Sequence, residues 1–206
     1  MRIEIRYVPA ILCGCAFLGA LAPLGIAHFR LLEPASWIEE GKLGDPQWLA
    51  PCGGSNGDPG KPTGAITKVQ GGGNMHIRIR EMAFHPGFYR VALAVNSRDE
   101  LPGDPEARTE WSGTVERSVS GTIQFPPAPP VLADGLFQHV AALDKDQETD
   151  IPIPNISCSK CTLQVIEFMA DHVRNPQGDF SYHHCADLQI RANPNKPIDT
   201  RWPVEK

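Results

Sequence analysis

The sequence predicts an all-β protein of the sandwich type. Twenty prolines and nineteen glycines divide the 206 residues into short apolar runs, which is typical of sandwiches with frequent turns. Long helical periodicity is absent from the chain, and this absence argues against a helical bundle.

Five segments are expected to be strands, because they combine apolar or β-branched residues with flanking turn residues. In chain order they are 76–80, 89–96, 121–124, 161–169 and 185–190. The last two are rich in Leu, Val, Ile and Phe, so we expect them in the core.

Two other segments are expected to lack regular structure. Residues 51–63 are rich in glycine and proline, and residues 125–130 are close to polyproline in composition. Residues 99–116 are charged and rich in turn residues, with Trp111 as their only aromatic residue. We interpret this last segment as a long insertion or connection.

The N-terminal region predicts a signal peptide over residues 1–27. Two arginines precede an apolar run, and Gly25 and Ala27 supply the small residues that signal peptidase prefers at −3 and −1. Cleavage there leaves one domain over residues 28–206, secreted or periplasmic, with His28 as its first residue. Two alternatives are a lasting membrane span and a lipoprotein modified at Cys15.

Charge and cysteine content narrow the class of protein. The whole chain has a formal charge of −5, and loss of the leader makes it one unit more negative, which argues against a nucleic-acid partner. The processed chain keeps Cys52, Cys158, Cys161 and Cys185. In an oxidising compartment these predict two disulfides with the pairing open, whereas a zinc site lacks a second Cys/His pair at ligand spacing.

A histidine at the mature N-terminus offers two nitrogens from one residue. The α-amine and the ring Nδ1 of His28 can chelate one metal ion, and one more imidazole would complete a three-nitrogen site. Such a site with open positions suits copper, and the low pKa of an α-amine favours loss of its proton at neutral pH. The best second imidazole is His85, at a Pro-Gly turn before an apolar strand; His76 is the alternative.

The segment around Tyr182 supplies the third element of the site. If the strand over 185–190 extends back a few residues, alternation places Tyr182, His184, Ala186, Leu188 and Ile190 on one face. His183, Cys185 and Asp187 then lie on the other face. Tyr182 is therefore either a core tyrosine or an axial neighbour of copper.

Together these motifs resemble the lytic polysaccharide monooxygenases, specifically bacterial proteins related to the chitin-binding type-4 domain. The likeness rests on the N-terminal segment His28-Phe29-Arg30-Leu31-Leu32-Glu33-Pro34 and a His-Pro-Gly segment at His85. It also rests on a Cys-x-x-Cys-Thr-Leu-Gln strand and the terminal Tyr-His-His-Cys-Ala-Asp-Leu strand. It spans nearly the whole of residues 28–206.

The resemblance implies an immunoglobulin or fibronectin-III-like sandwich with a copper histidine brace on one surface. His28 and His85 would bind copper, Tyr182 would be the axial aromatic residue, and His184, or instead His183 or Gln164, would donate a hydrogen bond near the metal. It also implies a monomer that takes electrons from an external donor and oxidises a polysaccharide surface, chitin, cellulose or envelope glycan.

Two features concern the substrate. Trp37, Trp48 and Trp111 are the aromatic candidates for polysaccharide contact, although each is as readily a packing residue. The loop after His28 carries Glu39 and Glu40 where chitin-active relatives usually present an arginine. A copper carrier with the same brace and a carbohydrate-binding sandwich without metal are the alternative functions.

Overall fold

The computed structural model describes residues 28–206, and the predicted leader over residues 1–27 lies outside them. Apart from one turn of 3-10 helix, η1 (Arg98–Glu100), the regular elements are strands. They are β1 (His28–Glu33), β2 (Ile66–Gln70), β3 (Asn74–Ala83), β4 (Gly87–Ala94), β5 (Ala107–Ser112), β6 (Val115–Gly121), β7 (Val131–His139), β8 (Gln147–Pro152), β9 (Cys158–Met169) and β10 (Ser181–Arg191). The predicted all-β class is confirmed.

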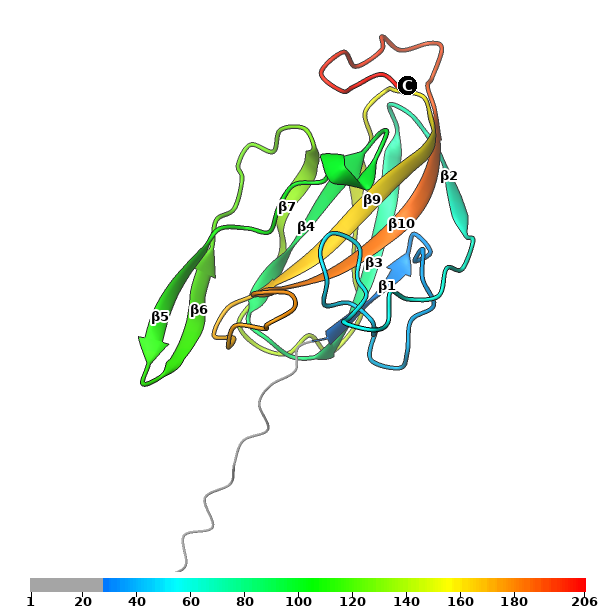
Figure 1. The fold of residues 1–206 in the computed structure, drawn as a ribbon. Coiled ribbons are helices and arrows are strands. Elements are labelled where there is room, and N and C mark those ends of the chain that lie inside the picture. Colours follow the sequence, from blue (N-terminus) through cyan, green and yellow to red (C-terminus); the bar gives the residue numbers. More distant parts are fainter. Residues whose placement is uncertain (1–27) are drawn as a thin grey trace, which may run out of the picture.

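Two sheets form the body of the molecule and a third, smaller one projects from it (Figure 1). The first sheet has the order β1-β3-β8 and the second the order β2-β10-β9-β4-β7. Their pairings are antiparallel except that of β2 with β10. One apolar core receives side chains from both sheets, so the architecture is a sandwich.

The central strands β9 and β10 carry much of this core, as expected from their composition. The alternation predicted for β10 is confirmed, because Tyr182, Ala186, Leu188 and Ile190 all belong to the core cluster. Both strands are buried along nearly their whole length, because β9 is internal to the sheet and β10 is flanked by β2.

The segment 99–116, predicted to be a long insertion or connection, contains most of a β-hairpin. Its second half forms β5 and the start of β6, joined by a turn at Gly113 with a positive φ of 62°. Residues of β5 are mostly exposed, and Trp111 is 68% exposed. The hairpin projects from the sandwich (Figure 1), so its sequence does not show the apolar face of a strand that packs on the core.

The prediction of a strand over residues 121–124 is wrong in its position. Strand β6 ends at Gly121 and residues 122–124 continue as irregular chain. The expected loops over 51–63 and 125–130 contain none of the named strands, which agrees with their composition.

The four cysteines pair as two disulfides, as predicted. Cys52 bonds to Cys185, and this joins the long loop after β1 to the middle of β10. Cys158 bonds to Cys161 within β9. The first bridge crosses 133 positions of sequence, so it fixes a loop that has few strand contacts of its own.

Candidate metal centre

Strand pairing brings the two predicted metal-binding histidines to the same end of the sandwich. His28 is the first residue of β1 and lies opposite Ala83, the last residue of β3. His85 follows two positions later, in the turn that leads to β4. The two histidines are 2% and 8% exposed, so they lie at the edge of the core.

Tyr182 and a further histidine complete a group of four neighbouring rings. The ring centroid of Tyr182 lies 5.4 Å from that of His28. The ring centroid of His172 lies 6.4 Å from that of Tyr182 and 4.7 Å from that of His85. The predicted residues His28, His85 and Tyr182 are therefore brought together, and His172 joins them.

A carboxylate orients the imidazole of His28. The Nε2 atom of His28 lies 3.1 Å from Oδ1 and 3.0 Å from Oδ2 of Asp45. A carboxylate accepts hydrogen bonds, so Nε2 carries the proton and a neutral ring holds its lone pair on Nδ1. This is the nitrogen that the brace requires, and a carboxylate behind a ligating histidine is a common arrangement in metal sites.

The loop that carries Asp45 is fixed on both sides. The side-chain oxygen of Gln47 accepts from the main-chain N–H of Phe29 at 3.2 Å. The main-chain oxygen of Gln47 accepts from the N–H of His183 at 2.8 Å. Through Gln47, the loop that carries Asp45 is thus bound to both β1 and β10, the strands that supply His28 and Tyr182.

The surroundings of His85 keep its imidazole neutral. Burial, followed by the neighbouring His172, lowers the pKa of His85 to about 4. Its Nδ1 is buried and makes no hydrogen bond within residues 28–206, and its main-chain N–H donates to Oε1 of Glu81 at 3.4 Å. A neutral imidazole is the form that binds a metal ion.

Tyr182 presents a protonated phenol in an apolar setting. Burial, and next the carboxylate of Asp45, raise the pKa of Tyr182 far above its ordinary value. Its ring is 2% exposed. The side chain therefore contributes shape and shielding and carries no negative charge.

His172 lies in the loop between β9 and β10, which the projecting hairpin holds in place. Its main-chain N–H donates to Oγ of Ser118 on β6 at 3.1 Å, and its carbonyl accepts from the N–H of Ser118 at 3.0 Å. The hairpin of β5 and β6 thus serves to position a ring beside His85.

A hollow of about 360 Å³ opens beside these rings. Its lining includes Trp48, His85, His172, Tyr182, Arg117 and Arg174. Of the three predicted aromatic candidates, Trp48 is therefore the one next to the site. Trp111 lies on the hairpin, and Trp37 packs under Arg98 with its Nε1–H donating to the carbonyl of Cys52.

The other predicted donors lie elsewhere in the fold. His184 is fully buried, with its Nε2 3.1 Å from the carbonyl of Phe29 and its Nδ1 3.3 Å from Glu40. His183 bonds to Asp104, and Gln164 donates to the carbonyl of Pro51. His76 lies beside Asp150 on the outer part of β3. None of these four side chains lines the hollow. His28 does not line it either, and it joins the group of rings through its contact with Tyr182.

Sequence reasoning missed Asp45 and His172. Asp45 occupies an Asp-Pro turn, and a carboxylate in a turn is common enough to carry no signal of its own. His172 follows the apolar run of β9 in an Asp-His segment. No sequence spacing connects an isolated histidine after a strand with His85, so His172 could not be predicted as its neighbour.

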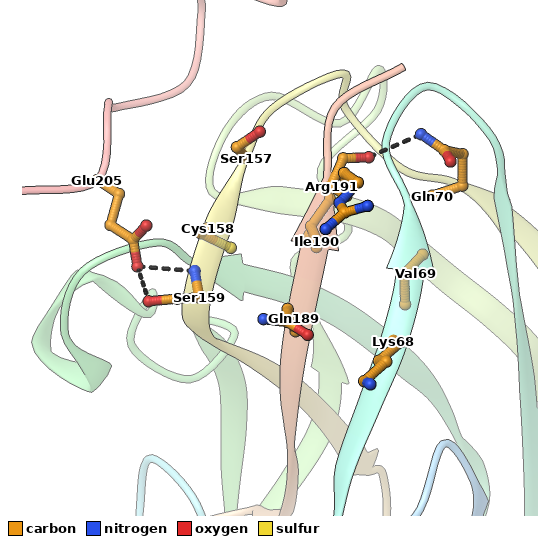
Figure 2. A pocket seen from close by; sticks show the side chains of 10 residues that line it. All are labelled: Lys68, Val69, Gln70, Ser157, Cys158, Ser159, Gln189, Ile190, Arg191 and Glu205. Atoms are coloured by element: carbon orange, nitrogen blue, oxygen red, sulfur yellow. Dashed lines mark hydrogen bonds between the residues drawn. The ribbon is translucent and has the colours of Figure 1, made fainter. Parts of the chain in front are cut away.

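A second hollow, of about 540 Å³, lies at the opposite ends of β9 and β10 (Figure 2). It is lined by Lys68, Gln70, Ser159, Arg191 and Glu205 among others. Glu205 accepts from the main chain of Ser159, and Gln70 donates to the carbonyl of Arg191 (Figure 2). The hydrogen bonds of Glu205 and Gln70 thus reach main-chain groups of neighbouring strands, and the lining of this hollow includes no imidazole.

No family model matches the chain, and no curated protein matches it either. Within residues 28–206, no helix has the length and apolar character needed to cross a membrane. The functional assignment therefore depends on the residues of the site.

Proposed function

We propose that this protein is a secreted, copper-dependent monooxygenase of the lytic polysaccharide type, with His28 and His85 as its histidine brace. Bound copper would supply one-electron chemistry, in which an external donor reduces the metal and peroxide or dioxygen then removes hydrogen beside a glycosidic bond. Leader removal would convert the amide nitrogen of His28 into a free α-amine, which could bind the metal together with Nδ1 of the same residue.

A single observation carries this proposal, namely the register of β1 on β3. It sets His28 opposite Ala83 and so beside the turn of His85, with Tyr182 5.4 Å from the His28 ring. The residues also fit copper chemically, because Asp45 accepts a hydrogen bond from the Nε2–H of His28 and His85 is neutral. Nitrogen donors of this kind are the ones that copper prefers.

The remaining residues position the substrate and control protons. Asp45 holds the His28 ring, and Tyr182 covers one side of the site with an uncharged aromatic face. His172 lies between His85 and Tyr182 at the hollow, where its imidazole can hold or donate a proton. The Trp48 side chain lines the same hollow and offers a surface for a sugar ring.

The decisive experiment compares the processed protein with two variants in Cu(II) titration calorimetry. One variant carries a glycine ahead of His28, which removes the free amine from that residue, and the other is His85→Ala. We expect at least a tenfold loss of affinity in both. His76→Gln, a surface histidine in an ion pair, serves as the control. Unchanged affinity in the first two variants would contradict the brace.

Activity needs a separate assay. The copper-loaded protein is incubated with reductant and peroxide on chitin, cellulose or peptidoglycan, and soluble products are analysed by mass spectrometry. Oxidised oligosaccharides from any of these polymers would support the enzyme.

A copper carrier is the second candidate, favoured by the burial of the brace. His28 and Tyr182 are each only 2% exposed, and a shielded site suits retention of a metal ion. Tight copper binding together with no oxidised product on any polymer would select the carrier, whereas absence of copper binding would leave a sandwich that binds carbohydrate alone.

A further inference from the structure

A second cluster of potential metal ligands lies between the two sheets. Glu81 comes from β3, His139 ends β7, and Glu167 lies on β9. One ligand atom from each lies within 4.8 Å of the others. The side chains of Glu81 and His139 are 3% and 5% exposed, and Glu167 is fully buried.

The tautomer of His139 is fixed by the main chain. Its Nδ1 lies 2.8 Å from the carbonyl oxygen of Phe137, which can only accept a hydrogen bond, so Nδ1 carries the proton. Its Nε2 lies 2.9 Å from Oε1 of Glu81. A lone pair on Nε2 would face a carboxylate oxygen, so either a second proton or a cation must lie between them. A ligating histidine whose other nitrogen donates to a carbonyl is a frequent arrangement around metal ions.

Glu167 is the least satisfied group in the cluster. Neither of its carboxylate oxygens has a hydrogen-bond partner within residues 28–206. The polar group that interacts with this carboxylate is the hydroxyl of Tyr89, which lies opposite Glu167 in the pairing of β4 with β9, although the two groups do not reach ordinary hydrogen-bond geometry. A fully buried carboxylate in this state is costly unless a proton or a metal ion neutralises it.

Charge indicates what the cluster lacks. Burial lowers the pKa of His139, but the hydrogen bonds to Glu81 and to the carbonyl of Phe137, with the charge of Glu81, outweigh it and raise that pKa, so without a cation a proton lies between His139 and Glu81. A divalent cation that displaced this proton and the proton of Glu167 would balance the two negative charges of the carboxylates beside a neutral imidazole. Burial, and next the negative charge of Glu81, raise the pKa of Glu167 well above its ordinary value. The main-chain N–H of Leu143 donates to Oε2 of Glu81 at 2.8 Å and so holds that carboxylate in place.

We propose that Glu81, His139 and Glu167 form a second, buried site for a divalent cation, with Zn²⁺ as the preferred ion. One imidazole and two carboxylates make a three-ligand set of the kind zinc accepts, with a fourth position for the Tyr89 hydroxyl or water. Mg²⁺ and Ca²⁺ favour sites made entirely of oxygen ligands.

This site would stabilise the turn that carries His85. Glu81 accepts from the main-chain N–H of His85, and the ring of Phe84 lies 6.0 Å from that of His139. An ion held by Glu81 and His139 would therefore immobilise the two side chains that contact this turn. Because its ligands are different residues, the second site does not depend on the copper proposal.

The test is zinc titration of the processed protein after removal of metal with chelator. The His85→Gln substitution weakens the brace, so zinc that binds to this variant reports on the buried cluster. We expect this variant to retain one Zn²⁺ by native mass spectrometry and to gain thermal stability with zinc. Glu167→Gln and His139→Gln in the same background should lower zinc affinity at least about tenfold.

Two controls separate a lost site from a lost fold. His76→Gln alters a surface histidine beside carboxylates and should leave zinc binding unchanged. A cooperative thermal transition in the Glu167→Gln protein shows that it is folded. The proposal is overturned if His85→Gln protein binds no zinc, or if Glu167→Gln and His139→Gln bind it as tightly as their parent. Copper titration of the processed wild-type protein tests the brace separately.

Discussion

The Nε2 atom of His28 lies 3.0 Å from the carboxylate of Asp45, a residue 17 positions later in the chain. This contact places the proton of a neutral His28 ring on Nε2 and its lone pair on Nδ1, the nitrogen that the proposed copper site requires. It connects the geometry of one loop to the chemistry of the proposed copper site.

Asp45→Ala is expected to weaken Cu(II) binding about 10- to 100-fold, because the His28 ring loses the acceptor that fixes its tautomer and orientation. Asp45→Asn keeps an acceptor oxygen and should fall between wild type and Asp45→Ala. Competition titration with a chromophoric chelator measures all three proteins. Equal affinities would show that Asp45 does not orient the ligand.

His172→Gln is expected to separate turnover from copper affinity. The ring lies 4.7 Å from His85 but is not one of the proposed ligands, so Cu(II) affinity should change less than about threefold. If His172 moves a proton during oxidation, turnover should fall about 100-fold. Initial rates of peroxide consumption with reductant measure this, and a parallel loss of affinity and rate would instead indicate a role in the ligand shell.

The pH dependence of copper binding should show that His85 is already neutral. Its pKa is lowered to about 4, so no proton leaves this ring when copper binds between pH 5 and pH 7. A ring with the ordinary pKa near 6.5 would lose about 25-fold in affinity over the same range, because protons would compete below pH 6.5.

The affinity ratio of wild type to His85→Gln isolates this effect. Protonation of the α-amine and of His28 affects both proteins alike and cancels in the ratio. We expect the ratio to stay constant within about twofold from pH 5 to pH 7. A steep fall of the ratio toward pH 5 would show that His85 titrates normally.

The two disulfides are expected to differ in their contribution to stability. The Cys52–Cys185 bridge closes 133 positions and the Cys158–Cys161 bridge closes three. The chain-entropy model gives upper values of about 5 and about 2 kcal/mol for loops of these lengths. Paired Cys→Ser variants in urea unfolding should therefore rank in that order. The reverse order would show that the loop from residue 51 is held by other contacts.

Local sequence patterns predicted the buried part of the fold well. The apolar runs of β9 and β10 marked the central strands, because buried strands need continuous hydrophobic residues. The hairpin of β5 and β6 was missed, since its exposed residues have no apolar face to reveal it. Strand β2 was missed for the same reason, as its side chains alternate between exposed and half-buried at the sheet edge.

The sequence alone determined the strand-rich class, the four cysteines available for bridging and the residue types of the site, His28, His85 and Tyr182. These follow from composition and from order along the chain. The tertiary structure alone decided that Asp45 and His172 belong beside them, that His184 does not line the hollow, and that Glu81, His139 and Glu167 meet. The physical reason is that strand register and loop closure set these distances, and neither leaves a local pattern in sequence.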